Sequence, residues 1–142
     1  MRIMSFDVGS QTIGVAVSDI FGWTAQGIET IRHTTRENDF KRLRQLTEEY
    51  KVEEFVIGMP LNMDGTKGIR AERTEDFARE LAESFPDIPY HFWDERLTTV
   101  MAQKELIAAD VSRKKRKKVI DKMAAIAILE GYLQHLSLTS RG

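Results

Sequence analysis

Three carboxylates, far apart in this chain of 142 residues, stand at positions where a reaction site could form. Asp7 ends the first apolar run, Glu95 closes a later one (YHFWDE), and Asp121 interrupts an Ala-rich apolar stretch. A carboxylate at the buried end of a strand is costly unless something pairs with it. Acids that converge repel each other unless a cation bridges them, and ligand sets made only of oxygen suit Mg²⁺ or Mn²⁺.

Two such ions about 4 Å apart can activate a water and stabilise the leaving oxygen of a phosphodiester. The pattern therefore predicts that Asp7, Glu95 and Asp121 share divalent ions. The alternative gives each acid its own salt bridge or helix cap. Spacing alone leaves that alternative open for Asp121, which borders the expected apolar face of its helix.

The elements that would position these acids follow from the apolar periodicity. Alternation and short apolar runs predict five strands, and apolar residues at helical spacing predict four helices. The strands are expected at 2–8, 12–19, 24–32, 53–60 and 90–95, and the helices at 37–50, 69–84, 98–108 and 113–136. Three strands in succession, followed by crossovers through helices, predict an α/β fold with a mixed five-stranded sheet. An antiparallel meander joins parallel strands there, and helices cover both faces.

In such sheets, sites form beyond the carboxyl ends of the parallel strands. This rule brings Asp7 and the Asp94–Glu95 pair to the same end. Because successive strand residues face opposite sides, only one member of that pair can point to the site.

Composition limits the class of protein. A hydrophobic fraction of 42% can fill the core of one domain, expected over 1–142 with 137–142 as a flexible tail. The absence of cysteine excludes disulfides and thiolate metal sites, and it fits a cytoplasmic protein. We expect no signal peptide and no membrane span. Since the net charge is only -1, any contact with nucleic acid must depend on a local basic patch.

One such patch is a run of six basic residues immediately before Asp121. Six consecutive helical positions circle the axis, so these side chains cannot share one face. We interpret the run as a basic arm that grips a phosphate backbone and leads it to the metal ions, the alternative being a solvated helix start. The residues are Arg113, Lys114, Lys115, Arg116, Lys117 and Lys118, with Arg96 as a weaker candidate of the same kind.

The segment LNMDGTKG at 61–68 is a second candidate for phosphate contact. It follows a strand and precedes a helix, whose first N–H groups attract anions. Gly65 and Gly68 free its backbone, and Asn62 and Lys67 can meet a phosphate. It is not a Walker A motif, and an ordinary surface loop is the alternative. Gly9, beside Asp7, can adopt a positive φ or allow a close approach of the backbone. A plain hairpin would also explain this glycine.

Four motifs in order narrow the interpretation further. FDVGSQTIGVAVSD, VIGMPLNMDGTKG, WDERLTT and RKKRKKVIDKMAAIAILEGYL together resemble the YqgF/RuvX family of the ribonuclease H-like superfamily, over nearly the whole chain. The resemblance implies a ribonuclease H-like fold and an acidic triad at Asp7, Glu95 and Asp121. It also implies a nuclease that matures the 5′ end of pre-16S rRNA or resolves Holliday junctions. The family's first motif often reads R-I-G where this chain has Thr12-Ile13-Gly14, which removes a possible phosphate contact but no metal ligand.

We therefore expect a metal-dependent nuclease that acts on RNA. Ribosomal precursor particles are the expected partners, and branched DNA is the second candidate substrate. An actin-like ATPase or sugar kinase and a non-catalytic RNA-binding module are the alternatives. The protein is expected to be a monomer or a homodimer, the latter suiting symmetric junction cleavage. The three histidines receive no role, and Trp23 and Trp93 are predicted to pack in the core.

Overall fold

The elements of the protein follow the predicted order. A computed structural model describes residues 1–97 and 113–140, and side chains for 1–97 and 122–139. The described elements are β1 (Ile3–Val8), β2 (Thr12–Ser18), β3 (Ala25–Arg32), α1 (Arg36–Glu49), β4 (Glu54–Met59), α2 (Ile69–Ser84), β5 (Tyr90–Asp94), the one-turn 3₁₀ helix η1 (Glu95–Leu97) and α4 (Arg113–Ser140). All five strands and three helices are confirmed within a few residues. The helix expected at 98–108 lies outside the described residues.

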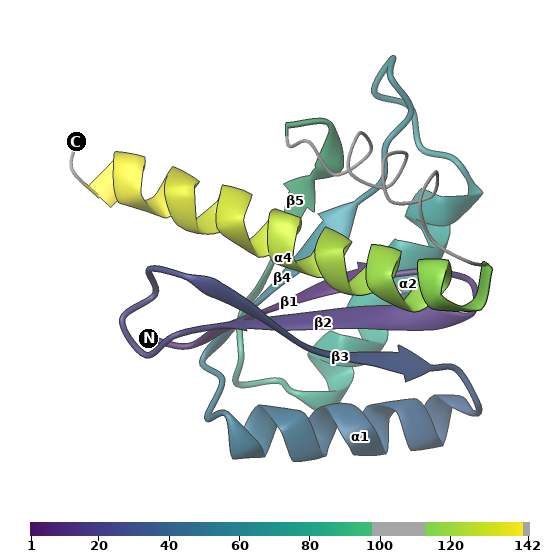
Figure 1. Cartoon of the computed structure of the whole chain (residues 1–142), viewed down its shortest axis with the longest axis horizontal. Coiled ribbons are helices and arrows are strands. Elements are labelled where there is room, and N and C mark those ends of the chain that lie inside the picture. Colours follow the sequence, from purple (N-terminus) through teal and green to yellow (C-terminus); the bar gives the residue numbers. More distant parts are fainter. Residues whose placement is uncertain (98–112, 141–142) are drawn as a thin grey trace.

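The five strands form one mixed sheet (Figure 1) in the order β3-β2-β1-β4-β5. Strands β1, β2 and β3 pair antiparallel, whereas β4 is parallel to both β1 and β5. The predicted meander with added parallel strands is therefore confirmed. Strand β1 lies in the middle, and all six of its residues are buried.

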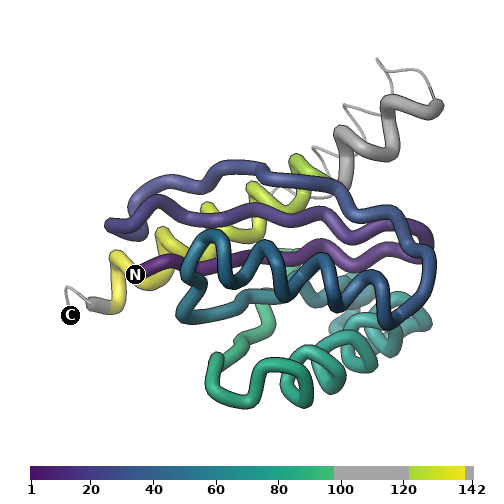
Figure 2. Tube along the Cα trace, turned by 90° about the horizontal axis from the view of Figure 1, so that it is seen from below, coloured from purple at the N-terminus to yellow at the C-terminus, as the bar shows by residue number. Residues whose placement is uncertain are grey.

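Helices cover both faces of the sheet, as the sequence predicts. On one face, apolar residues of α1 and α2 pack with Met4, Phe6 and Val8 of β1. On the other face, α4 packs with Ile3 of the same strand. Figure 2 shows the strands between α4 and the pair α1 and α2. Because side chains alternate along a strand, residues 3, 5 and 7 share the α4 face.

Small residues let α4 lie close to the sheet. A Cβ atom added to Gly58 of β4 would lie 2.3 Å from Ile128 Cδ1, and one added to Gly27 of β3 would lie 2.7 Å from Lys122 Cε. Between these two points, the hydroxyl of Ser5 donates a hydrogen bond of 2.7 Å to the carbonyl oxygen of Ala125. The register of α4 on β1 is thus fixed by a buried polar contact as well as by packing.

Helix α4 extends beyond its predicted end. It continues to Ser140, through residues 137–140 of the segment expected to be a tail. No helix in the described part of the chain combines the length and the apolar character needed to cross a bilayer.

The two tryptophans differ in their surroundings. Trp93 packs against the core on the α4 face, as predicted. Trp23 has an exposed fraction of 77%, so the prediction that it lies in the core is wrong. Trp23 belongs to the turn between β2 and β3, where local sequence does not determine whether an apolar side chain finds a covering element.

Tyr132 joins α4 to β4. Its hydroxyl donates a hydrogen bond to the carboxylate of Glu54, and its ring stacks on that of His91 with centroids 5.9 Å apart. Burial, together with the hydrogen bond to Glu54, raises the pKa of Tyr132 well above its ordinary value. A raised pKa in the folded state stabilises the fold below the pKa of the unfolded chain, and this contribution is lost as pH rises through the folded value.

We therefore expect Tyr132→Phe to lower the free energy of unfolding at pH 7 by about 1–2 kcal/mol, because it removes a hydrogen bond to a charged acceptor. Above about pH 10, where tyrosine ionises in an unfolded chain, wild-type stability should fall faster than that of the variant. Urea denaturation at pH 7 and pH 10.5 measures both effects. Tyr90→Phe is the control, and an equal pH response of Tyr132→Phe and wild type would contradict the prediction.

Candidate active site

Asp7 lies near the carboxyl end of β1, with an exposed fraction of only 3%. Alternation along the strand places it on the α4 face, two residues after Ser5. Its antiparallel partner on β2 is Gly14. On the other side, Phe6 pairs with Ile57, so the next residue of that parallel register is Gly58. Asp7 is therefore flanked by glycine on both neighbouring strands, and at Gly58 the side chains of Ile128 and Glu95 fill the place of a Cβ.

Glu95 approaches the same place from β5. It is the first residue of η1, directly after the strand, and its exposed fraction is 4%. Its Cγ lies 3.3 Å from the point where a Cβ of Gly58 would stand. Asp7 and Glu95 are thus both buried, on one face and at one end of the sheet, next to a single glycine. Of the pair Asp94 and Glu95, it is Glu95 that turns inward.

The third predicted acid, Asp121, belongs to α4. Its backbone lies one turn before Ala125, the residue that Ser5 contacts. Its side chain lies outside the described part of the structure. Among the described side chains, no three of His, Cys, Asp and Glu are grouped to hold a metal ion, and Asp121 is not in that set.

The six basic residues at 113–118 form the first turns of α4 rather than an arm separate from it. Their backbone is helical, and their side chains lie outside the described set. The run therefore leads directly, along one helix, to position 121.

The loop at 61–68 is an ordered turn. Asn62 N donates to Thr66 O over 3.0 Å, and Gly65 N donates to Asn62 O over 2.8 Å. The carboxylate of Asp64 accepts from Thr66 N over 2.9 Å. Gly65 has a φ of 87°, a conformation that favours glycine. Gly68 is the N-cap of α2 and supplies no side-chain cap, so the helix begins without a side-chain acceptor for its first N–H groups. The Asn62 amide donates to the Thr66 hydroxyl.

Lys67 projects from this loop. Its Nζ lies 3.2 Å from a carboxylate oxygen of Glu75, and its side chain has an exposed fraction of 58%. An ion pair this exposed contributes little energy, so a phosphate can compete for the ammonium group.

Arg96, by contrast, holds the loop in place. Its Nε and Nη2 donate to Asp94 over 3.0 and 2.7 Å, and its Nη1 donates to the carbonyl oxygen of Met63 over 3.2 Å. The hydrogen bonds from the Arg96 side chain hold the pKa of Asp94 below its usual range. Since Arg96 follows Glu95 directly, it connects the predicted phosphate loop to the element that carries a buried acid.

His33 is a residue at this end that the sequence did not mark. Its Nε2 lies 3.0 Å from the carbonyl oxygen of Gly9, and its Nδ1 lies 2.8 Å from a carboxylate oxygen of buried Asp39. Gly9 itself is needed for a close approach, because a Cβ there would lie 3.1 Å from Thr12 O. His33 thus ties β3 and α1 to the turn that follows Asp7.

Comparison with known proteins shows which family this chain belongs to. The model of the RuvX family, described as Holliday junction resolvase, matches residues 1–135. The chain belongs to the RuvX family. It is 59% identical over 133 residues to a protein of Desulforamulus reducens named "Putative pre-16S rRNA nuclease", covering 94% of this chain and 96% of that one. A Bacillus subtilis protein of the same name is 54% identical over 139 residues, covering 96% of this chain and 100% of its own.

A solved structure of another protein has the same architecture. RuvC of T. thermophilus in complex with a Holliday junction substrate superposes with a TM-score of 0.61 at 10% sequence identity, covering 96% of both chains. At that identity the likeness shows the fold, and it confirms the ribonuclease H-like class that the motifs predict.

Arg96→Lys should release the loop of this RuvX protein, because an ammonium cannot donate to Asp94 and Met63 in the same planar fork. We expect the amides of 62–68 to exchange hydrogen about five- to tenfold faster, which corresponds to a lost charge-assisted hydrogen bond. Hydrogen exchange followed by mass spectrometry measures this. Lys67→Gln is the control and should change the exchange rate of the loop less than Arg96→Lys does. Equal effects would contradict the conclusion that Arg96 holds the loop in place.

His33→Ala should lower the free energy of unfolding by about 1–3 kcal/mol, because the buried carboxylate of Asp39 loses its imidazole partner and keeps only the N–H of Thr34. Asp39→Asn in the His33→Ala background should then cost less than it does in wild type. A double-mutant cycle by urea denaturation gives the coupling energy. Additive effects of the two substitutions would show that the contact contributes nothing to stability.

Proposed function

We propose that this RuvX protein is a metal-dependent nuclease that hydrolyses phosphodiester bonds, with the 5′ end of pre-16S rRNA as its substrate. The observation that supports the proposal best is the placement of Asp7 and Glu95. Two buried acids, 88 positions apart in the chain, lie on one face at one end of the sheet, Glu95 against Gly58 and Asp7 on the neighbouring strand.

The residues at this end fit Mg²⁺ or Mn²⁺. Both acids offer only oxygen donors, which hard divalent ions prefer. When bound, a pair of such ions supplies an activated water and stabilises the leaving oxygen. The contribution of the protein is to hold and orient the two carboxylates that would bind the ions. Strand β1 carries Asp7, and η1 carries Glu95.

Asp121 is the proposed third ligand. Going from Ser5 to Asp7 along β1 covers about 6.6 Å, and going from Ala125 back to Asp121 along α4 covers about 6 Å. Strand β1 and helix α4 run in opposite directions in Figure 1, so both steps lead toward the same end of the sheet. The hydrogen bond between Ser5 and Ala125 therefore brings the backbone at 121 toward Asp7.

Binding of the phosphate backbone is proposed for three features at this end. The basic turns of α4 at 113–118 precede Asp121, Lys67 is an exposed cation, and the N-terminus of α2 begins at Gly68 without a side-chain cap. Asn62 belongs to the same loop. Arg96, first considered a phosphate contact, is better assigned to holding this loop, because its donors already face Asp94 and Met63.

The substrate is proposed from the names of the relatives. The curated relatives at 54–59% identity are named for pre-16S rRNA, which favours a ribosomal precursor and a cytoplasmic site of action. Four-way DNA is the second candidate, favoured by the description of the family model as Holliday junction resolvase. A monomer suffices for trimming one RNA end, whereas a homodimer would suit symmetric junction cleavage.

Asp7→Asn tests the proposal. We expect Mn²⁺-dependent cleavage of a precursor 16S RNA to fall by about a hundredfold or more, because a metal ligand and its charge are lost. Mn²⁺ should also raise the melting temperature of wild type but not that of the variant, since ligands stabilise only the form that binds them. Asp87→Asn, at an exposed acid in a distant loop, is the matched control.

Each failure has its own signature. Cleavage that persists unchanged in Asp7→Asn points to a contaminating nuclease and leaves a non-catalytic RNA-binding module as the function. Absence of any Mn²⁺ or Mg²⁺ binding by calorimetry would contradict the metal site. Cleavage of four-way DNA in preference to precursor RNA would reverse the order of the two substrates.

A further inference from the structure

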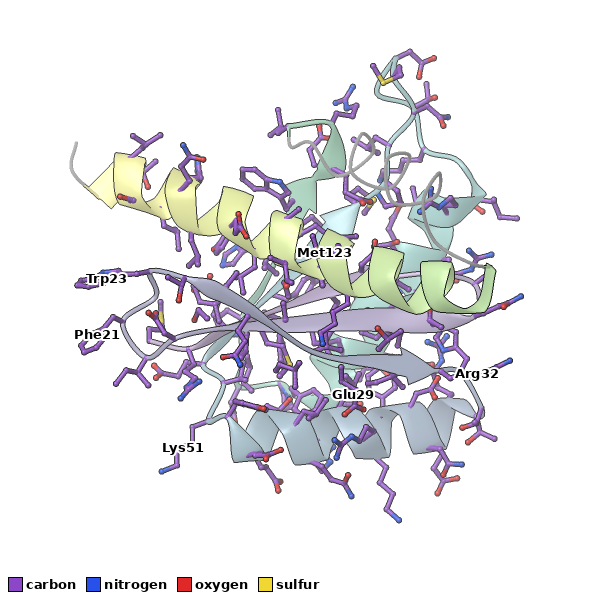
Figure 3. All side chains as sticks on the ribbon, viewed as in Figure 1. Phe21, Trp23, Glu29, Arg32, Lys51 and Met123 are labelled. Carbon is purple, nitrogen blue, oxygen red and sulfur yellow. The ribbon has the colours of Figure 1, made fainter. Side chains whose placement is uncertain are left out.

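The turn between β2 and β3 exposes an aromatic pair. Phe21 and Trp23 have exposed fractions of 67% and 77%, and their ring centroids lie 5.4 Å apart. Ile20 and Met1, also more than half exposed, adjoin them through a hydrogen bond from the N-terminal ammonium group to Ile20 O. In Figure 3 both aromatic side chains project from the end of the molecule. Contiguous exposed apolar side chains of this kind mark an interaction site more often than scattered ones do.

This turn is held in one conformation. The carboxylate of Asp19 accepts a hydrogen bond of 2.8 Å from Trp23 N, and this bond lowers the pKa of Asp19. Gly22 N donates to Asp19 O over 3.1 Å, and Gly22 has a φ of 71°. The aromatic rings are thus presented on an ordered backbone, which reduces the entropy that binding would cost.

A groove of about 680 Å³ lies between this turn and α4. Trp23 forms part of one wall, and Leu133 and Glu130 form part of the other. Glu130 is the one charged side chain among the described residues that line the groove. A groove that offers an aromatic ring, a leucine and a carboxylate among polar side chains is complementary to a cation on an apolar stem.

We propose that this groove binds an arginine side chain of a partner polypeptide. The guanidinium would stack on the Trp23 ring and pair with the Glu130 carboxylate, and its aliphatic stem would contact Leu133. Arginine fits better than lysine, because its planar group can stack and form two parallel hydrogen bonds together. A protein segment that carries arginine between apolar residues would also cover Phe21 and Ile20.

Charge favours a polypeptide over nucleic acid at this place. Asp19 accepts a hydrogen bond from Trp23 N and Glu130 lines the groove, and both carboxylates would repel phosphate groups. The turn that carries Trp23 follows the end of β2 that pairs with the amino end of β1, whereas Asp7 lies near the carboxyl end of β1 and Glu95 directly after β5. A bound partner therefore leaves the proposed active site open, and the inference does not depend on the metal chemistry proposed there.

The experiment uses a fluorescein-labelled peptide of alternating arginine and leucine, titrated with the full-length protein and followed by anisotropy. We expect Trp23→Ala to weaken binding about tenfold or more, as for a buried aromatic hot spot, and Glu130→Gln to weaken it roughly three- to tenfold. A peptide with glutamine in place of arginine should bind wild type as weakly as the original peptide binds Trp23→Ala. Leu138→Ser, at an exposed side chain of α4 outside the groove lining, and Glu83→Gln, on α2, should bind like wild type.

Several results would overturn the proposal. One is equal binding of the arginine and glutamine peptides, and another is an equal loss in Trp23→Ala and Leu138→Ser. A wild-type dimer in light scattering that Trp23→Ala dissociates would assign the groove to a second copy of the chain. A tenfold loss of binding to labelled single-stranded RNA in Trp23→Ala would assign it to nucleic acid. If Trp23→Ala does not fold, as checked by circular dichroism, the Glu130→Gln titration decides alone.

Discussion

The close contact between α4 and the middle of the sheet is the constraint on which the rest of this structure depends. It requires small residues on both partners: glycine at 27 and 58 on the strands, and buried alanine at 124 and 125 on the helix. A single buried hydrogen bond, from Ser5 to the carbonyl oxygen of Ala125, then fixes how far the helix is shifted along β1. Any side chain larger than hydrogen at Gly58 would collide with the Cδ1 end of Ile128, which would have to move.

One of these small residues, Gly58, also lies beside the acids. A sheet residue normally has neighbours whose side chains stand 4.5–5.5 Å away on the same face. Asp7 has Gly14 on one side and, by register, Gly58 on the other, and the place of a Gly58 side chain is taken by Ile128 and Glu95. Gly58 thus takes part both in the close packing of α4 and in the placement of Glu95.

Around this centre, polar contacts at the same end of the sheet hold the neighbouring loops in place. Arg96 joins the 62–68 loop to the end of β5, and His33 joins the turn after Asp7 to α1 through Asp39. The other end of the sheet carries an exposed aromatic turn and a groove against α4. The two ends of the sheet thus have different chemistry, acids and cations at one and aromatic rings at the other, and α4 passes over both.

The sequence by itself determined the elements and their order, because periodicity is set by neighbours along the chain. Alternation at 3–8 and 12–18 and helical spacing at 36–49 are local properties, and they were sufficient to predict a mixed sheet with helices on both faces. The position of Asp7 near the end of its strand could likewise be predicted from the sequence. The four motifs further identified the family, which the comparisons confirm.

Only the tertiary structure decided which side chains meet. Glu95 rather than Asp94 turns inward, Arg96 faces Asp94 and Met63, His33 has two acceptors, and Trp23 is exposed. Each of these outcomes depends on residues brought together from distant parts of the chain, or on the absence of a covering element. Local pattern carries no information on such contacts, because the same strand or helix satisfies its own backbone hydrogen bonds whichever partner its side chains find.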